Sequence, residues 1–258
     1  MSRLVVVTGA ASGIGAAVAA LLRSCGDRVI GVDLKDAEVC ADLATPEGRA
    51  AAVEAVLDQS GGVVDGLVTC AGLSGSSPLL PRVNFFGTTE LAVGLRPALA
   101  ASTAPRVVLI GSISGTHPVD QALVDALLAD DETLAVSLTE TAIADGRAQQ
   151  LYPSSKSAIA QWARRTCVSA GWADAGIAVN VVAPGVVLTP MSAALVADPE
   201  MKQVMDAAVP MPLHGYAAPE DLARVVGFLL SPELTHVTGQ VLYVDGGAEA
   251  SLRPASQF

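Results

Sequence analysis

The chain has 258 residues, of which about half are hydrophobic and few are aromatic, a composition that suits one large α/β domain with a substantial core. The formal net charge is −11 and the isoelectric point is about 4.6, which argues against nucleic acid or an anionic membrane surface as the main partner. No apolar run approaches the ~18 residues of a membrane span, and no signal-peptide pattern follows the first apolar segment. We therefore expect a cytoplasmic protein that binds neither nucleic acid nor membrane.

The cysteines and histidines show no spacing that is typical of a metal site. No Cys-x-x-Cys pair occurs, and the histidines are scattered along the chain. The cysteines lie far apart and are interpreted as small, reduced core residues, as expected in the cytoplasm. We predict no metal site from these residues, which are Cys25, Cys40, Cys70, Cys167, His117, His214 and His236.

The first predicted unit is a strand, a glycine-rich turn and a helix. Residues 4–8 are apolar and rich in β-branched side chains, which indicates a strand buried on both faces. Residues 16–25 are rich in alanine and leucine, which favours a helix that ends at Gly26. Backbone N–H groups at the start of such a helix can bind a pyrophosphate, although an ordinary tight turn is the alternative interpretation. The residues predicted to bind the phosphates are Gly9, Ser12, Gly13, Ile14 and Gly15.

An aspartate ends the second predicted strand. Asp33 lies 18 residues after Gly15, where a carboxylate can hydrogen-bond both ribose hydroxyls of an adenosine. The same carboxylate would repel the 2′-phosphate of NADP, and neither Ser12 nor Leu34 offers a compensating positive charge. The spacing thus predicts NAD as the cofactor, with Leu34 beside the adenosine and Lys35 as the one nearby residue that argues for NADP.

The rest of the chain alternates predicted strands with predicted helices. Asp42 and Leu43 follow a short strand and are expected to flank the adenine, with Asp42 near its amino group. Alternating β and α units predict one domain over residues 1–258, with a doubly wound, seven-stranded parallel sheet of Rossmann type and ligands at the carboxyl ends of its strands. Residues 188–213 form a predicted lid. The predicted strands are residues 28–32, 38–41, 66–70, 106–110, 177–183 and 240–244, and the predicted helices are residues 46–60, 79–101, 118–149, 152–173 and 219–230.

Tyr152 and Lys156 lie four residues apart, so that on a helix they occupy one face. A free tyrosine has a pKa near ~10, and a neighbouring ammonium would lower that pKa toward the range in which the phenol can exchange protons. Pro153 is tolerated only in the first turn of a helix, so this helix is expected to begin at or just before Tyr152. The alternative interpretation is an exposed tyrosine beside a solvated lysine.

A set of motifs occurs in chain order on the expected elements, namely Thr8-Gly9-x-x-x-Gly13-Ile14-Gly15, Ser112 and Tyr152-x-x-x-Lys156. This set resembles the motifs of the short-chain dehydrogenase/reductase family, and the resemblance spans essentially the whole chain. It implies an NAD-dependent oxidoreductase in which Tyr152 exchanges the proton, Lys156 holds the nicotinamide ribose and Ser112 hydrogen-bonds the substrate oxygen. Ser114, two residues further on, is the alternative for the role of Ser112.

The resemblance assigns roles to further residues. Asn84 matches the family's helix asparagine and would anchor a water that links Lys156 to solvent, while a local hydrogen bond within the helix is the alternative. The turn Pro184-Gly185 matches the turn that packs near the nicotinamide in the family. The other residues that the resemblance assigns to the cofactor are Cys70, Ala71, Gly72, Val187 and Thr189, besides Tyr152 and Lys156.

The chain departs from the family pattern in two places. Ala71-Gly72 matches the end of the family's Asn-Asn-Ala-Gly motif, but Thr69-Cys70 replaces both asparagines, a difference that bears on how the central strand is held. Ser112 and Tyr152 are 40 residues apart, more than in most family members, so that residues 116–149 contain a helical insertion. Such an insertion resembles the bacterial 3α-hydroxysteroid dehydrogenase/carbonyl reductases, as do the stretches at residues 36–43, 65–73 and 253–258.

Apolar and methionine side chains of the lid are candidates for a wide substrate pocket. Methionines adapt to varied shapes, and together with the resemblance these residues favour a steroid or another bulky hydrophobic ketone as the substrate. The alternative is that they only pack the lid onto the domain. The residues are Val187, Leu188, Met191, Leu195, Met201, Met205, Val209 and Met211.

Three leucines of the insertion, Leu123, Leu127 and Leu128, either extend that pocket or cover a surface that other family members use for association. In the second case the expected assembly is a homodimer through the face of the seventh strand, instead of the homotetramer that is common in the family.

Two rival functions remain at this point. A reductase of acyl thioesters or small polyol ketones would carry basic residues at the entrance to its active site and prefer NADP. Asp33 and the negative net charge of the chain count against this function. A non-catalytic NAD-binding sensor would have no need of Ser112, Tyr152 and Lys156 together. The sequence therefore favours an NAD-dependent hydroxysteroid dehydrogenase that acts in steroid metabolism.

Overall fold

A computed structural model describes residues 2–257, so Met1 and Phe258, the last residue of the C-terminal stretch noted above, lie outside the described part. Seven strands form one parallel sheet in the order β3-β2-β1-β4-β5-β6-β7, which confirms the predicted doubly wound sheet. The strands are β1 (Leu4–Thr8), β2 (Arg28–Asp33), β3 (Val39–Cys40), β4 (Gly66–Thr69), β5 (Arg106–Ile110), β6 (Ala178–Pro184) and β7 (Val241–Val244).

The order of the strands determines where a ligand can bind. β1 pairs with both β2 and β4, with Val6 opposite Ile30 on one side and Leu67 on the other. The chain therefore winds outward from β1 in one direction and then from β4 in the other. In an open α/β sheet, ligands usually bind in the crevice at the carboxyl ends of the two strands where the winding direction changes, here β1 and β4.

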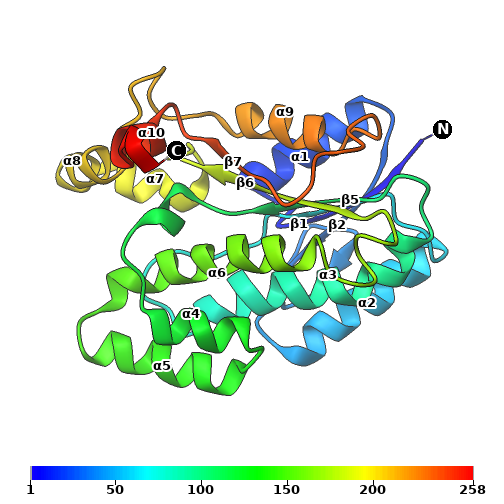
Figure 1. The fold of residues 1–258 in the computed structure, drawn as a ribbon, viewed down its shortest axis with the longest axis horizontal. Coiled ribbons are helices and arrows are strands. Elements are labelled where there is room, and N and C mark those ends of the chain that lie inside the picture. The colour runs from blue at the N-terminus through cyan, green and yellow to red at the C-terminus, as the bar shows by residue number, and fades with distance from the viewer. Residues whose placement is uncertain (1, 258) are drawn as a thin grey trace.

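Helices cover both faces of the sheet (Figure 1). α1 (Gly13–Ser24) and α9 (Pro219–Leu229) lie together on one face, and α2 (Pro46–Ser60), α3 (Gly87–Ala100) and α6 (Leu151–Thr166) lie on the other. Successive residues of β1 belong alternately to the two hydrophobic cores, because neighbouring side chains of a strand point to opposite faces. This explains why the strands read as continuous apolar runs.

The helix that carries Tyr152 ends earlier than predicted. α6 begins at Leu151, as Pro153 requires, but it ends at Thr166 instead of residue 173. The residues after it form turns in which Gly171 and Gly176 have φ angles of 79° and 71°. A right-handed helix cannot continue through such angles, so the helix cannot extend over Gly171 to residue 173.

The insertion between β5 and α6 is helical, as expected, but it forms two helices where the sequence predicted one helical segment. α4 (Gln121–Leu128) packs against α6, and α5 (Glu132–Ala144) packs against α4 (Figure 1). Each begins at an aspartate, Asp120 or Asp131, whose carboxylate accepts a hydrogen bond from a backbone N–H of the first turn. Arg147 forms an ion pair with Asp120 at 2.6 Å and so joins the two ends of the insertion.

The predicted lid contains α7 (Pro190–Ala197) and α8 (Pro199–Ala208), each of which begins with a proline. Neither helix has a buried residue, and both lie with α10 (Ala248–Leu252) at the left-hand end of the molecule in Figure 1. Among the residues that the structure describes, no helix combines the length and the apolar character that crossing a membrane would require.

Candidate active site

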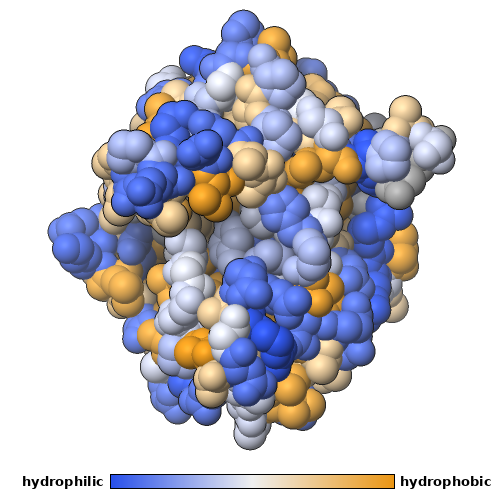
Figure 2. Space-filling view, turned by 90° about the vertical axis from the view of Figure 1, so that its left-hand side faces the viewer, coloured by the Kyte–Doolittle hydropathy of each residue, from blue (hydrophilic) through white to orange (hydrophobic). Residues whose placement is uncertain are grey.

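A cavity of about 590 Å³ is lined by the segments that follow β1 to β6 at the carboxyl ends of these strands. Figure 2 shows this face of the molecule, which is hollowed between the lid side and the insertion side. Ser112 lines the cavity, and Asn84 is buried behind its wall. All the residues predicted to bind the cofactor line it as well, namely Gly9, Ser12, Gly13, Ile14, Gly15, Asp33, Leu34, Asp42, Leu43, Cys70, Ala71, Gly72, Tyr152, Lys156, Pro184, Gly185, Val187 and Thr189.

In the glycine-rich turn after β1, the backbone packs against itself and against the backbone of the loop after β4. A Cβ at Gly15 would lie 2.1 Å from the carbonyl oxygen of Gly9, and a Cβ at Gly9 would lie 2.8 Å from the backbone nitrogen of Ala71. Gly9 also has a φ of 66°, which other residues rarely adopt. The side chain of Ser12 makes no capping hydrogen bond, so it does not occupy the first N–H groups of α1. This arrangement fits a pyrophosphate at the start of α1.

Asp33 is held in place at the end of β2. Its carboxylate accepts hydrogen bonds from the backbone nitrogens of Ala11, at 3.0 Å, and Leu34, at 2.7 Å. Lys35 is exposed and is not among the residues that line the cavity. A fixed carboxylate at this place fits a pair of ribose hydroxyls and disfavours a phosphate.

Asp42 and Leu43 follow β3 and form part of the same wall. The carboxylate of Asp42 accepts a hydrogen bond from the backbone nitrogen of Ala44 at 2.9 Å, which stabilises the loop. Its position beside the adenine amino group stays a prediction.

Ser112 follows β5, and its hydroxyl shares a hydrogen bond with the phenol of Tyr152. The same hydroxyl accepts a hydrogen bond from the backbone nitrogen of Ser114 at 3.1 Å. The segment Ile113–Thr116 forms a 3-10 turn, and Ser114 also lines the cavity. The bond to the phenol distinguishes Ser112 from Ser114.

The electrostatics of Tyr152 differ from the expectation. Burial raises the pKa of its phenol above the ordinary value, and the hydrogen bond with Ser112 offsets only part of that rise. The expectation that Lys156 lowers this pKa is therefore wrong for the structure as it stands, although the ammonium lies 5.7 Å from the ring centre. Burial lowers the pKa of Lys156 itself to about 8, and its Nζ donates a hydrogen bond to the carbonyl oxygen of Ile110 at 2.8 Å.

Asn84 lies in a π-helical segment, Arg82–Phe86, that divides the predicted helix before α3. Its Oδ1 accepts a hydrogen bond from the backbone nitrogen of Leu73 at 2.7 Å, and its Nδ2 donates to the carbonyl of Leu73 and to the hydroxyl of Ser155. These partners are 11 and 71 residues away in sequence, so the bonds are not local to the helix. The water that would link Asn84 to Lys156 stays a prediction.

Two contacts hold the end of β4, where the family's asparagines are absent. The hydroxyl of Thr8 accepts a hydrogen bond from the backbone nitrogen of Ala71 at 3.0 Å, and Asn84 binds the residues just beyond. The hydroxyl of Thr69 is buried without a hydrogen-bond partner among the described residues. Burial raises the pKa of the Cys70 thiol to about 12, so that thiol is uncharged at neutral pH.

The lid supplies an apolar part of the cavity wall. Most of the lid residues predicted to line a pocket do line this cavity, namely Val187, Met191, Leu195, Met205 and Val209. Leu188 and Met211 line a neighbouring cavity instead, and Met201 is exposed.

The leucines of the insertion do not extend the cavity. Leu123 and Leu127 are buried in the core beneath α4, and Leu128 packs against that core. The insertion therefore covers the outer face of α6.

Sequence reasoning missed the loop after β4. Its position after the carboxyl end of a central strand was the signal that could have identified it. Among the missed residues that line the cavity are Leu73, Ser74, Gly75 and Leu79 of this loop and Val83 just beyond it.

No group of three or more His, Cys, Asp or Glu side chains is placed to hold a metal ion within residues 2–257.

Comparison with known proteins agrees with this geometry. A family model described as Enoyl-(Acyl carrier protein) reductase matches residues 9–249. The doubly wound sheet and the meeting of Ser112, Tyr152 and Lys156 in one cavity define a nucleotide-dependent oxidoreductase. The chain belongs to the short-chain dehydrogenase/reductase family, whose members use NAD(P).

Individual relatives cover nearly the whole chain. It is 38% identical to the 3-alpha-hydroxysteroid dehydrogenase/carbonyl reductase of Comamonas testosteroni, over 99% of both chains. It superimposes with a TM-score of 0.91 on the crystal structure of the 3-alpha-hydroxysteroid dehydrogenase from Pseudomonas sp. B-0831 complexed with NADH, with 42% identity over 97% of this chain and 98% of the other. It is also 27% identical to the 3-oxoacyl-(acyl-carrier-protein) reductase FabG of Vibrio cholerae, over 95% of this chain and 96% of the relative.

Proposed function

We propose that the protein is an NAD(H)-dependent hydroxysteroid dehydrogenase of the 3α-hydroxysteroid dehydrogenase/carbonyl reductase type. It would interconvert a secondary alcohol and a ketone on a bulky hydrophobic substrate. The observation that carries the proposal is the meeting of Ser112, Tyr152 and Lys156 in a cavity that apolar lid side chains also line. Similarity to two steroid dehydrogenases over almost the whole chain supports the substrate class.

The protein's own groups manage the proton and the substrate oxygen, while the dinucleotide, when bound, supplies the hydride chemistry. Tyr152 accepts the proton of the alcohol in oxidation and returns it to the oxygen in reduction. The hydroxyl of Ser112 would give up its hydrogen bond to Tyr152 and donate to the substrate oxygen, where charge develops, while the backbone nitrogen of Ser114 still donates to the serine oxygen. Lys156, held by the carbonyl of Ile110, would contact the nicotinamide ribose.

The preference for NAD rests on Asp33. Two backbone N–H groups fix its carboxylate at the edge of the cavity, where it can accept hydrogen bonds from ribose hydroxyls. A 2′-phosphate at that position would meet a negative charge, and Lys35 is exposed outside the cavity lining. The relative whose structure holds NADH supports the same choice.

The first experiment measures turnover of androsterone with NAD and with NADP, by the absorbance of the reduced cofactor. A small polyol and a 3-oxoacyl thioester are measured in parallel. We expect NAD-dependent oxidation of androsterone, and a loss of at least about a thousandfold in Tyr152→Phe, because the ring then has no exchangeable proton. Tyr152→Phe should still bind NADH.

Other outcomes separate the rival functions. Equal use of NADP would refute the role of Asp33. Faster turnover of the thioester or the polyol than of any steroid would refute the substrate class. NADH binding without turnover of any alcohol or ketone would indicate a non-catalytic sensor, and activity in Tyr152→Phe equal to wild type would refute the mechanism.

We also propose a homodimer that associates through α9 and β7. The insertion covers α6, whereas the apolar side chains of Phe228 in α9 and Leu242 in β7 are left 57% and 39% exposed. Sedimentation analysis should give a dimer for the wild type and a monomer for Phe228→Glu. A tetramer, or a dimer that Phe228→Glu leaves intact, would contradict this assembly.

A further inference from the structure

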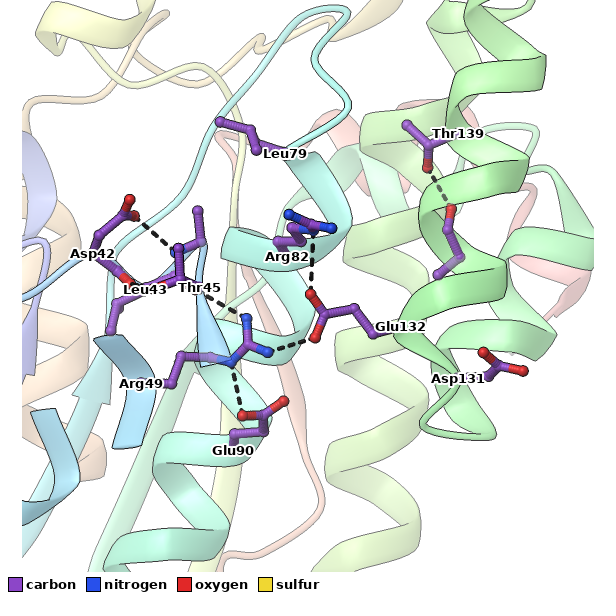
Figure 3. Close-up of polar contacts among 12 residues, drawn as sticks. Asp42, Leu43, Thr45, Arg49, Leu79, Arg82, Glu90, Asp131, Glu132 and Thr139 are labelled. Atoms are coloured by element: carbon purple, nitrogen blue, oxygen red, sulfur yellow. Dashed lines mark hydrogen bonds and ion pairs between the residues drawn. The ribbon is translucent and has the colours of Figure 1, made fainter. Parts of the chain in front are cut away.

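Arg49, in the first turns of α2, is only 1% exposed. An arginine keeps its charge inside a protein, so complete burial requires partners around the whole guanidinium group. Each nitrogen has one: Nε donates to Glu90 at 2.7 Å, Nη1 to the carbonyl oxygen of Leu43 at 3.3 Å, and Nη2 to Glu132 at 2.5 Å. Figure 3 shows the guanidinium between these three acceptors.

The three acceptors come from three different parts of the fold. Glu90 belongs to α3, Leu43 to the loop after β3, and Glu132 is the first residue of α5 in the insertion. The second carboxylate oxygen of Glu132 pairs with Arg82 at 3.2 Å (Figure 3). Two arginines thus face two glutamates, and the cluster is electrically balanced.

The loop that Arg49 holds is part of the cavity wall. Asp42 and Leu43 line the cavity, and the loop is packed tightly on both sides. A Cβ at Gly48 in α2 would lie 2.0 Å from the carbonyl oxygen of Asp42, and a Cβ at Gly87 in α3 would lie 3.2 Å from the Cβ of Leu43. The peptide group between Leu43 and Ala44 is held at both ends, because its carbonyl accepts from Arg49 and its N–H donates to the Asp42 carboxylate.

We propose that Arg49 is a positioning residue for the adenine end of the dinucleotide, and that the insertion acts on this end through Glu132. The inference rests on the proposed NAD(H)-dependent function. Glu132 balances the charge of Arg49 and keeps Nη1 directed at Leu43. Without that carboxylate the guanidinium would turn toward Glu90, which is the more exposed of the two glutamates, and the loop would lose its hydrogen bond. The insertion then has a role in cofactor binding although none of its leucines lines the cavity.

The test compares two fragments of the cofactor by calorimetry on the full-length protein. ADP-ribose contains the adenine, and reduced nicotinamide mononucleotide does not. Glu132→Gln should raise the Kd of ADP-ribose about tenfold and leave the Kd of reduced nicotinamide mononucleotide within about twofold. Arg49→Lys should show the same split, because one ammonium cannot reach three separate acceptors. Combining Arg49→Met with Glu132→Gln should cost no more than Arg49→Met alone, because Glu132 acts through Arg49.

Glu140→Gln is the matched control, because it makes the same change at an exposed position of α5. It should bind both fragments as the wild type does. Unchanged binding of ADP-ribose to Glu132→Gln and Arg49→Lys would overturn the inference, and so would an equal loss for both fragments, which would indicate a general structural defect. A wild type that binds NADH and turns over substrate would in either case leave the proposed function standing, whereas a wild type that binds no NADH would refute both.

Discussion

The ammonium of Lys156 donates a hydrogen bond to the carbonyl oxygen of Ile110, the last residue of β5. Ser112 is two residues beyond Ile110, and Tyr152 is one helical turn before Lys156. This hydrogen bond therefore joins the end of the strand that leads to the serine to the helix that carries the tyrosine. This buried lysine has a structural role in addition to the contact with the ribose that we propose for it.

Replacing Lys156 with methionine should change how stability depends on pH. The pKa of Lys156 falls from an ordinary 10.5 to about 8 in the folded protein because of burial. Between these values the unfolded chain binds a proton that the folded chain does not, so the free energy of unfolding should rise as the pH rises. Relative to Lys156→Met, the wild type should gain about 2 kcal/mol between pH 7 and pH 9.5.

Urea unfolding at several pH values measures this difference. Lys202→Met, at an exposed lysine of α8, is the control and should show no such gain. A gap between wild type and Lys156→Met that stays constant with pH would show that the buried ammonium is not destabilised by burial.

Ser112→Ala and Ser114→Ala should separate the two serines. We expect Ser112→Ala to lower kcat by about 10²–10³, because it removes the donor to the substrate oxygen. In the oxidation assay, where Tyr152 acts as a base, it should also move the acid limb of the pH–rate profile to higher pH, since the hydrogen bond from Ser112 lowers the pKa of Tyr152. Ser114→Ala leaves the backbone N–H that binds Ser112 in place and should keep kcat within about twofold. A larger loss in Ser114→Ala than in Ser112→Ala would reverse the assignment.

Gly15→Ala should disrupt the phosphate-binding turn. The added Cβ would lie 2.1 Å from the carbonyl oxygen of Gly9, and a backbone atom cannot move aside as a flexible side chain can. We expect the free energy of unfolding to fall by about 1–3 kcal/mol and NADH binding to weaken strongly. In Gly227→Ala the new Cβ meets only the end of the Leu21 side chain, so this helix variant should be neutral or up to about 1 kcal/mol more stable. Thermal unfolding measures the first effect and NADH fluorescence the second. Normal NADH binding by Gly15→Ala would contradict a phosphate site at this turn.

Asp33→Asn should shift the choice of cofactor. It removes the negative charge at the ribose but keeps the shape of the side chain, so kcat/KM should fall about tenfold for NAD and rise for NADP. Asp36→Asn makes the same charge change three residues away, at a φ of 55° that asparagine also tolerates. It should leave the ratio of kcat/KM for NAD to kcat/KM for NADP unchanged. If both variants shift the ratio equally, the general charge of the loop and not the contact of Asp33 sets the preference.

Local patterns in the sequence predicted the framework of the protein. The strands that end at Thr8, Asp33 and Ile110 were found because a strand covered on both faces is a continuous apolar run. The glycine-rich turn was found because its glycines stand between a predicted strand and a predicted helix. The Tyr152–Lys156 pair was found because a spacing of four residues places both side chains on one face of a helix. All these features depend on residues within a few positions of one another.

The tertiary structure alone decided features that join distant segments. Arg49 meets Glu132 across 83 residues, and Asn84 meets Ser155 across 71, and no local pattern marks either pair. The direction of the pKa of Tyr152 was mispredicted for the same reason: adjacency to Lys156 is visible in the sequence, but burial is not. Side-chain identity and spacing determine which groups can share an element, whereas desolvation and long-range partners exist only once the chain has packed.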